Sequence, residues 1–130
     1  MKNLTPHQAH AWLQAHPSAL FVDVRMEIES LYVGRPPGVV NVPWYDYPDL
    51  QPDPQKFVEA VAQQVTGKNQ PLLLICRSGQ RTIAAGRVLV EAGYTDLQHV
   101  VHGFEGELDM DFKRSTVSGW RFDGLPWEQM

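Results

Sequence analysis

Apolar residues in this chain gather into short runs that alternate with longer amphipathic stretches. The runs at residues 20–24 and 72–75 are continuous and of strand length, as in strands that are buried on both faces. Shorter runs at residues 39–43 and 97–101 are interpreted as two further strands. Because helical patterns separate these runs, the sequence predicts an α/β fold with a mostly parallel central sheet and helices on both faces.

Start and stop signals place the helices between the strands. The predicted helices cover residues 6–16, 53–67 and 82–92, with a further turn or two of helix within residues 26–32. Thr5 and Asp53 are interpreted as the N-caps of the first two helices, and Gly93 ends the third. Residues 44–54, which begin with aromatic residues and proline, are expected to form a surface loop.

Length and charge narrow the function classes. The chain has 130 residues, which fits one domain with one core. Its net charge is −4, and no block of Lys or Arg lies outside residues 77–81, so nucleic acid and anionic membranes are poor partners. No apolar stretch approaches the length that spans a membrane, and the N-terminus lacks a signal-type apolar core. We therefore expect a cytoplasmic protein.

The chain contains a single cysteine, Cys76. One cysteine excludes an internal disulfide framework and a zinc site built from several thiolates. A reduced thiol fits the cytoplasm, and no metal or cofactor is expected.

Cys76 is also the strongest candidate for chemistry. It lies between a predicted strand and a predicted helix, so the intervening loop presents several backbone N–H groups to one point at the helix N-terminus. Such a loop binds an anion, and its arginines favour the thiolate over the thiol. A thiolate at an anion site indicates nucleophilic chemistry on an anionic substrate, whereas an inert, packed cysteine is the alternative. The loop residues are Arg77, Ser78, Gly79, Gln80 and Arg81.

Polar residues also close the first apolar run, where Asp23 and Arg25 stand. Open α/β sheets bind ligands at the carboxyl ends of their strands, so both residues are expected near the Cys76 loop. A structural ion pair of Arg25 with Glu27 or Glu29 is the alternative.

The histidines are assigned no role. His7 and His10 stand one helical turn apart without a third ligand, which favours a solvated face over a metal site. His99 and His102 are interpreted in the same way, as structural or solvated side chains.

Four motifs taken together resemble those of a rhodanese domain, the family of single-domain thiosulfate sulfurtransferases. They are Asp23-Val24-Arg25, the turn Pro37-Gly38, the loop from Cys76 to Arg81, and the turn from Gly103 to Gly106. The resemblance implies a three-layer, rhodanese-like α/β domain over residues 1–130, with a core at about residues 4–108. Residues 109–130 are then expected to form a C-terminal extension that packs on the core.

The resemblance implies sulfur transfer. In the family, the cysteine takes a sulfane sulfur from thiosulfate, releases sulfite and passes the sulfur to a thiophilic acceptor such as a thiol or cyanide. By position, Cys76 would be the nucleophile and persulfide carrier, and the N–H groups of residues 77–81 would cradle the persulfide. Arg77 and Arg81 would orient the anionic donor, while Asp23 and Arg25 would shape the pocket without touching the substrate.

Two other functions stay open at this point. The domain could be a persulfide relay that one protein loads and another unloads, with residues 44–47 and 120–127 as docking surfaces. A phosphatase or arsenate reductase is less favoured, because the loop of those enzymes is one residue longer than the four residues between Cys76 and Arg81. The sequence also places no obvious aspartic general acid for a leaving alkoxide.

Overall fold

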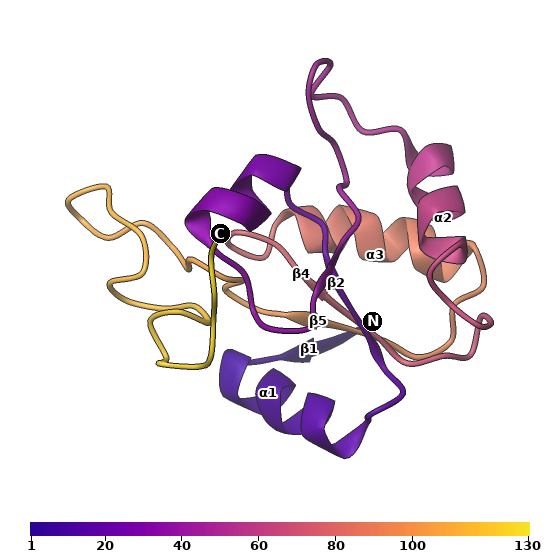
Figure 1. Cartoon of the computed structure of the whole chain (residues 1–130), viewed down its shortest axis with the longest axis horizontal. Coiled ribbons are helices and arrows are strands. Elements are labelled where there is room, and N and C mark those ends of the chain that lie inside the picture. The colour runs from indigo at the N-terminus through magenta and orange to yellow at the C-terminus, as the bar shows by residue number, and fades with distance from the viewer.

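The computed structural model describes all 130 residues, as a central sheet flanked by helices (Figure 1). The strands are β1 (Lys2–Leu4), β2 (Leu20–Asp23), β3 (Val40–Asn41), β4 (Leu72–Ile75) and β5 (Leu97–Val100). The helices are α1 (Pro6–Ala15), α2 (Pro54–Ala62), α3 (Arg81–Glu91) and a short π-type helix, η1 (Glu29–Val33). All neighbouring strands pair in parallel, in the order β1-β5-β4-β2-β3. The predicted α/β fold with a parallel sheet is therefore confirmed.

Alternation along the buried strands divides the core between the two faces of the sheet. Leu72 and Leu74 of β4 pack in a cluster with residues of α2 and α3. Leu73 and Ile75 pack in the opposite cluster, together with residues of α1. Figure 1 shows α1 on one side of the sheet and α3 on the other. Cys76 continues the alternation and belongs to the first cluster, so its side chain lies on the α2 and α3 face.

The first two helices begin at the predicted caps. Thr5 and Gln8 form a capping box, in which the amide of Gln8 donates to Thr5 Oγ1 at 3.2 Å and the amide of Thr5 donates to Gln8 Oε1 at 3.0 Å. Asp53 Oδ1 accepts from the amide of Lys56 at 3.2 Å. None of the helices is both long enough and apolar enough to cross a membrane.

The second helix is shorter than its sequence pattern suggests. It ends at Ala62, so the prediction that it continues to near Gly67 is wrong. Beyond it, the amide of Thr66 donates to Gln70 Oε1 at 2.8 Å. This side-chain hydrogen bond holds a turn where a further helical turn was expected.

Two other local features differ from the sequence expectation. β1 pairs with β5, although its three residues carry no strand pattern. Residues 44–54 are not on the surface throughout, because Trp44 is only 8% exposed and packs edge-on against Phe57 of α2, with ring centroids 5.2 Å apart. Trp44 therefore belongs to the core beneath α2.

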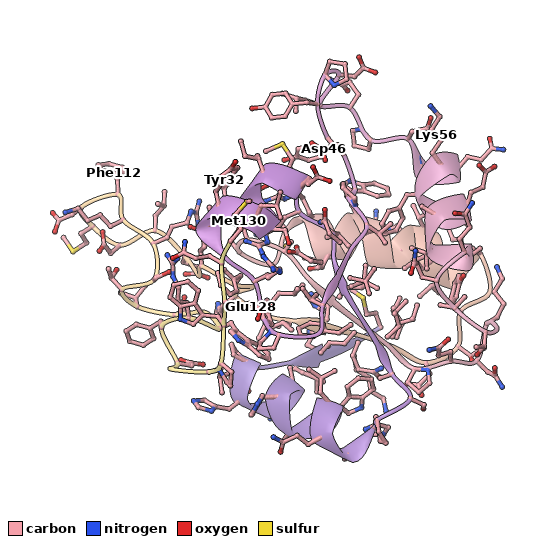
Figure 2. All side chains as sticks on the ribbon, in the orientation of Figure 1. Tyr32, Asp46, Lys56, Phe112, Glu128 and Met130 are labelled. Atoms are coloured by element: carbon pink, nitrogen blue, oxygen red, sulfur yellow. The ribbon has the colours of Figure 1, made fainter.

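The segment after β5 folds back over the α1 face without forming a regular helix or strand. Trp120 is 1% exposed, and its ring lies against Phe21 of β2 with centroids 5.6 Å apart. The last residues run beside η1, where the amide of Met130 donates to Leu31 O at 3.1 Å. Figure 2 shows Met130 beside Tyr32 at this helix. The tail thus reaches from the end of β5 across one face to η1.

Candidate active site

The thiol of Cys76 lies at the carboxyl end of β4, one residue past the strand. The loop that follows turns back on the cysteine, because Gly79 adopts a φ of 99° that favours glycine. The amide of Gly79 donates to Cys76 Sγ at 3.1 Å. Cys76 is 1% exposed, so the approach to its sulfur is narrow.

A second turn, residues 103–106, fixes the loop from behind. The amide of Phe104 donates to Cys76 O at 2.8 Å. Arg77 O accepts from the amides of Glu105 and Gly106, at 2.9 and 3.2 Å. These bonds turn the carbonyl oxygens of Cys76 and Arg77 toward the 103–106 turn.

Four of the five backbone N–H groups in residues 77–81 have no hydrogen-bond acceptor in the protein. Apart from the Gly79 amide, which donates to the cysteine sulfur, none of the loop amides donates a hydrogen bond within the protein. The free amides belong to Arg77, Ser78, Gln80 and Arg81. Unpartnered N–H groups at the start of α3 form a site that suits an anion, as the sequence predicted for such a loop.

Arg81 is held in a two-point ion pair rather than projecting freely. Its Nη1 and Nη2 donate to the Glu29 carboxylate at 2.6 and 2.9 Å, and both side chains are 12% exposed. Burial alone would raise the pKa of Glu29, but the hydrogen bonds and charge of Arg81, helped by the Met26 amide and the charge of Arg25, lower it. Burial alone would likewise lower the pKa of Arg81, and Glu29 raises it. The Arg81 guanidinium also lies 5.4 Å from the centre of the Tyr45 ring.

The other loop side chains face outward. Arg77 and Gln80 are exposed, and Ser78 is half-buried. Arg77 forms no ion pair, so its positive charge is the one that the loop leaves unpaired.

Asp23 and Arg25 form a separate, fully buried ion pair. Arg25 Nε and Nη2 donate to the Asp23 carboxylate at 2.9 and 2.7 Å, and Nη2 also donates to Gly34 O at 2.7 Å. The alternative in which Arg25 pairs with Glu27 or Glu29 is therefore wrong.

The Arg25 pair does not reach the loop directly. Its guanidinium stacks over Phe104 at 4.7 Å from the ring centre, and Phe104 belongs to the cluster on the α1 face. The Cys76 side chain lies on the opposite face. One link from Arg25 to the loop is therefore Phe104, whose amide donates to Cys76 O.

The structure adds two residues that sequence reasoning missed. Thr82, in the first turn of α3, places its Oγ1 3.7 Å from Cys76 Sγ. His99 of β5 is 4% exposed, and its Nδ1 lies 2.8 Å from Thr82 Oγ1. Alternation from the buried Leu97 places His99 on the α3 face of the sheet. The pairing of β5 with β4, which brings His99 close to the cysteine, cannot be predicted from the local sequence.

The remaining histidines stay apart from the cysteine. His102 is 44% exposed at its side chain, and its Nδ1 lies 3.5 Å from Glu107 Oε1. His10 lies edge-on to Trp120 at 5.8 Å between ring centroids. No three of the chain's His, Cys, Asp and Glu side chains are grouped so that they could hold a metal ion.

Comparisons with known proteins agree on one family. The model of the rhodanese-like domain matches residues 5–107. The crystal structure of Rv0390 from M. tuberculosis is 38% identical, covers 100% of this chain and 98% of its own, and superposes with a TM-score of 0.86. An uncharacterized protein of Rickettsia conorii is 26% identical over an alignment of 133 positions that covers 98% of this chain and 98% of that protein. Mouse thiosulfate sulfurtransferase/rhodanese-like domain-containing protein 3 is 30% identical over 87 residues, 66% of this chain and 55% of that protein.

Proposed function

Because the chain belongs to the rhodanese-like domain family, we propose that it is a sulfurtransferase that works through a persulfide on Cys76. The donor is thiosulfate or a similar sulfane-sulfur compound, and the acceptor is a thiophile such as a thiol or cyanide. The family match and the likeness to the mouse protein support a sulfurtransferase-family role. The geometry around the single cysteine supports the persulfide route.

The proposed reaction moves one sulfur atom in two displacement steps. In the first, the Cys76 thiolate attacks the sulfane sulfur of thiosulfate, so that a Cys76 S–S bond forms while the donor's S–S bond breaks. The electron pair of the broken bond leaves with sulfite. In the second, the acceptor attacks the outer sulfur, and Cys76 departs as the thiolate. The cysteine returns to its starting state, and the balanced steps use no cofactor.

One observation carries this proposal: the cysteine sulfur lies 3.1 Å from the Gly79 amide, inside a loop whose other N–H groups have no protein acceptor. A thiolate gains these donors, and so does the outer sulfur of a persulfide as negative charge develops on it. Cys76 is also 1% exposed, which suits a slender sulfur donor better than a bulky phosphoester. Phosphatase or arsenate reductase activity is therefore not part of the proposal.

The two arginines of the loop have different parts in donor binding. Arg77 is exposed and unpaired, so it supplies the charge that draws in an anion. Arg81 is neutralised by Glu29, so it fixes the start of α3 beside the cysteine. Any guanidinium N–H that Glu29 does not use can donate a hydrogen bond to the donor. The primary partner in this proposal is a small anionic sulfur donor, and a protein that donates or accepts sulfur is the secondary one. A reduced thiol suits a location in the cytoplasm.

The first test is the intact mass of the protein after incubation with thiosulfate. We expect a gain of one sulfur atom, about 32 Da, that a thiol reductant reverses. Cys76→Ser should fold with nearly unchanged stability and gain no mass. Ser78→Ala is a matched control in the same loop, and it should still be loaded.

Two results would count against the proposal. Mass gain in Cys76→Ser would place the sulfur elsewhere. If neither thiosulfate nor an inorganic polysulfide loads the parent protein, the chain does not carry sulfur on Cys76. Loading by polysulfide alone would keep the persulfide and replace thiosulfate as the donor.

A further inference from the structure

A continuous line of side chains joins the cysteine to the edge strand of the sheet. It runs from Cys76 Sγ to Thr82 Oγ1 at 3.7 Å, then to His99 Nδ1 at 2.8 Å. On the far side of the ring, His99 Nε2 lies 2.8 Å from Asn3 Oδ1. The strand register explains the alignment, because His99 is paired with Asn3 of β1 and with Leu74 of β4, two residues before the cysteine.

The hydrogen positions along this line follow from what each atom can do. The Asn3 amide oxygen only accepts, so Nε2 of His99 carries a hydrogen and donates to it. Nδ1 of the neutral ring is then an acceptor. The Thr82 hydroxyl has two acceptors in reach, Gly79 O at 3.2 Å and His99 Nδ1 at 2.8 Å, and in this arrangement it donates to the nearer one. The oxygen of Thr82 is left free to accept from the Cys76 thiol.

A second arrangement uses the same contacts with two hydrogens moved. If the Cys76 S–H bond breaks and its proton goes to Thr82 Oγ1, the hydroxyl hydrogen can pass to His99 Nδ1. The ring is then an imidazolium that donates to both Thr82 and Asn3, and the hydroxyl donates to the thiolate. The three contacts of this line, Cys76 to Thr82, Thr82 to His99 and His99 to Asn3, are all kept, and the direction of the hydrogen bond is reversed at the first two.

Resting on the proposed function, we propose that His99 is a positioning residue for sulfur transfer, which takes the proton of Cys76 through the Thr82 hydroxyl and so holds the cysteine as a thiolate. No step needs a further reactant, because the proton stays within the line and the electron pair stays on sulfur. The acceptor step returns Cys76 as a thiolate beside the same imidazolium. A merely buried, structural histidine would leave the protonation of the cysteine unchanged.

Apart from the cysteine, the surroundings of His99 favour the neutral ring over the imidazolium. Burial lowers its pKa, and the positive amino terminus of Met1 lowers it further. His102 and Glu107, beyond β5, line a surface hollow of about 340 Å³ together with His99. From α3, Ile83 lines the same hollow and Thr82 contacts the ring, and neither side chain titrates. No carboxylate bonds to the ring, so the Cys76 thiolate is the negative charge that compensates the imidazolium.

Ultraviolet absorbance of the thiolate, followed against pH, tests this inference without any substrate. The chain has one cysteine, so Cys76→Ser provides the blank that removes the tyrosine signal. We expect His99→Gln to raise the pH midpoint of thiolate formation by about one unit, which means roughly tenfold less thiolate below the midpoint. His102→Asn removes a neighbouring histidine that does not touch Thr82, and it should leave the midpoint in place.

Two further variants separate proton transfer from packing. Thr82→Val breaks the line and should raise the midpoint as His99→Gln does, whereas Thr82→Ser should restore the parent value. The double variant that combines Thr82→Val with His99→Gln should shift the midpoint no further than either change alone. Asn3→Asp places a carboxylate against Nε2 and should lower the midpoint, because it stabilises the imidazolium.

The inference is overturned if His99→Gln, folded by circular dichroism, titrates like the parent. It is equally overturned if Asn3→Asp raises the midpoint. Should His99→Gln not fold, the direction of the Asn3→Asp shift decides, because Asn3 contacts the His99 ring and not the cysteine. The absorbance does not depend on sulfur loading, so the two proposals fail separately. A protein that titrates as expected but gains no sulfur from thiosulfate or polysulfide would contradict the proposed function, while proton transfer from Cys76 to His99 would still be supported.

Discussion

At the scale of single residues, the active-site loop keeps one of its two arginines for charge and commits the other to an ion pair. Glu29 receives two hydrogen bonds from Arg81, and both side chains are 12% exposed. Removing one partner of such a pair leaves the other charge buried without compensation. The pair therefore sets both the stability of the loop and the charge that an anionic donor meets.

Glu29→Gln tests both consequences. At neutral pH we expect a loss of about 2–3 kcal/mol in the free energy of unfolding, measured by urea denaturation. The pKa of Glu29 is lowered in the folded protein, so its contribution is complete above the ordinary value of 4.5 and is lost as pH falls through the folded value. The difference between parent and variant should thus shrink below pH 4.5. Release of Arg81 should also lower the thiosulfate concentration needed for half-maximal loading by several-fold.

The control for this prediction lies two residues away. Glu27 is exposed and forms no ion pair, so Glu27→Gln changes the net charge equally without unpairing Arg81. We expect it to alter stability by less than about 0.5 kcal/mol. A Glu29→Gln protein that behaves like Glu27→Gln at every pH would show that the ion pair contributes nothing.

At the scale of elements, the site is made by β4, α3 and the 103–106 turn packed behind the loop. Gly103 has a φ of 62°, and a Cβ placed there would press on the carbonyl of Cys76 and lie 2.6 Å from the carbonyl carbon of Arg77. Only glycine lets the two turns approach this closely. The shape of the loop is thus imposed by a segment more than twenty residues further along the chain.

Gly103→Ala should push the two turns apart. We expect a loss of about 3 kcal/mol or more, from overpacking added to a strained left-handed φ, together with slower sulfur loading. Gly38→Ala is the matched control, because Gly38 has a similar φ of 76° but nothing within 4 Å of a Cβ. It should cost only the backbone strain, about 1 kcal/mol, and should not affect loading. Equal losses of stability and loading in the two variants would contradict the close approach.

The part of the site that is local in sequence could be predicted, and the part made by strand pairing could not. The run of apolar residues before Cys76 and the helix after it follow from periodicity, so the loop and its amides were expected. His99 was assigned no role, because its contact with Thr82 depends on which strand lies beside β4. The ion pair of Arg81 was also missed, since Glu29 comes from a π-type helix with no distinctive pattern.

At the scale of the whole molecule, the C-terminal tail connects the α1 face to the helix that holds Glu29. Arg35, just after η1, exchanges backbone hydrogen bonds with Glu128 at 2.8 and 2.9 Å. Midway along the tail, Trp120 packs against Phe21 and buries its ring. Figure 2 shows the Phe112 loop of the tail, by contrast, at the outer edge of the molecule. Trp120 therefore anchors the tail, and the stretch around Phe112, which is 83% exposed, does not.

Trp120→Ala should consequently weaken the fold while leaving the chemistry of the remaining folded protein intact. Removal of a buried tryptophan should cost about 3–5 kcal/mol in urea denaturation. Phe112→Ala, at an aromatic residue of the same tail, should cost less than about 0.5 kcal/mol. Trp120 belongs to the cluster on the face opposite the Cys76 side chain, so folded Trp120→Ala should titrate and load sulfur like the parent. Altered titration in the folded variant would mean that the tail acts on Cys76 through η1, and equal costs for the two changes would mean that the tail has no single anchor.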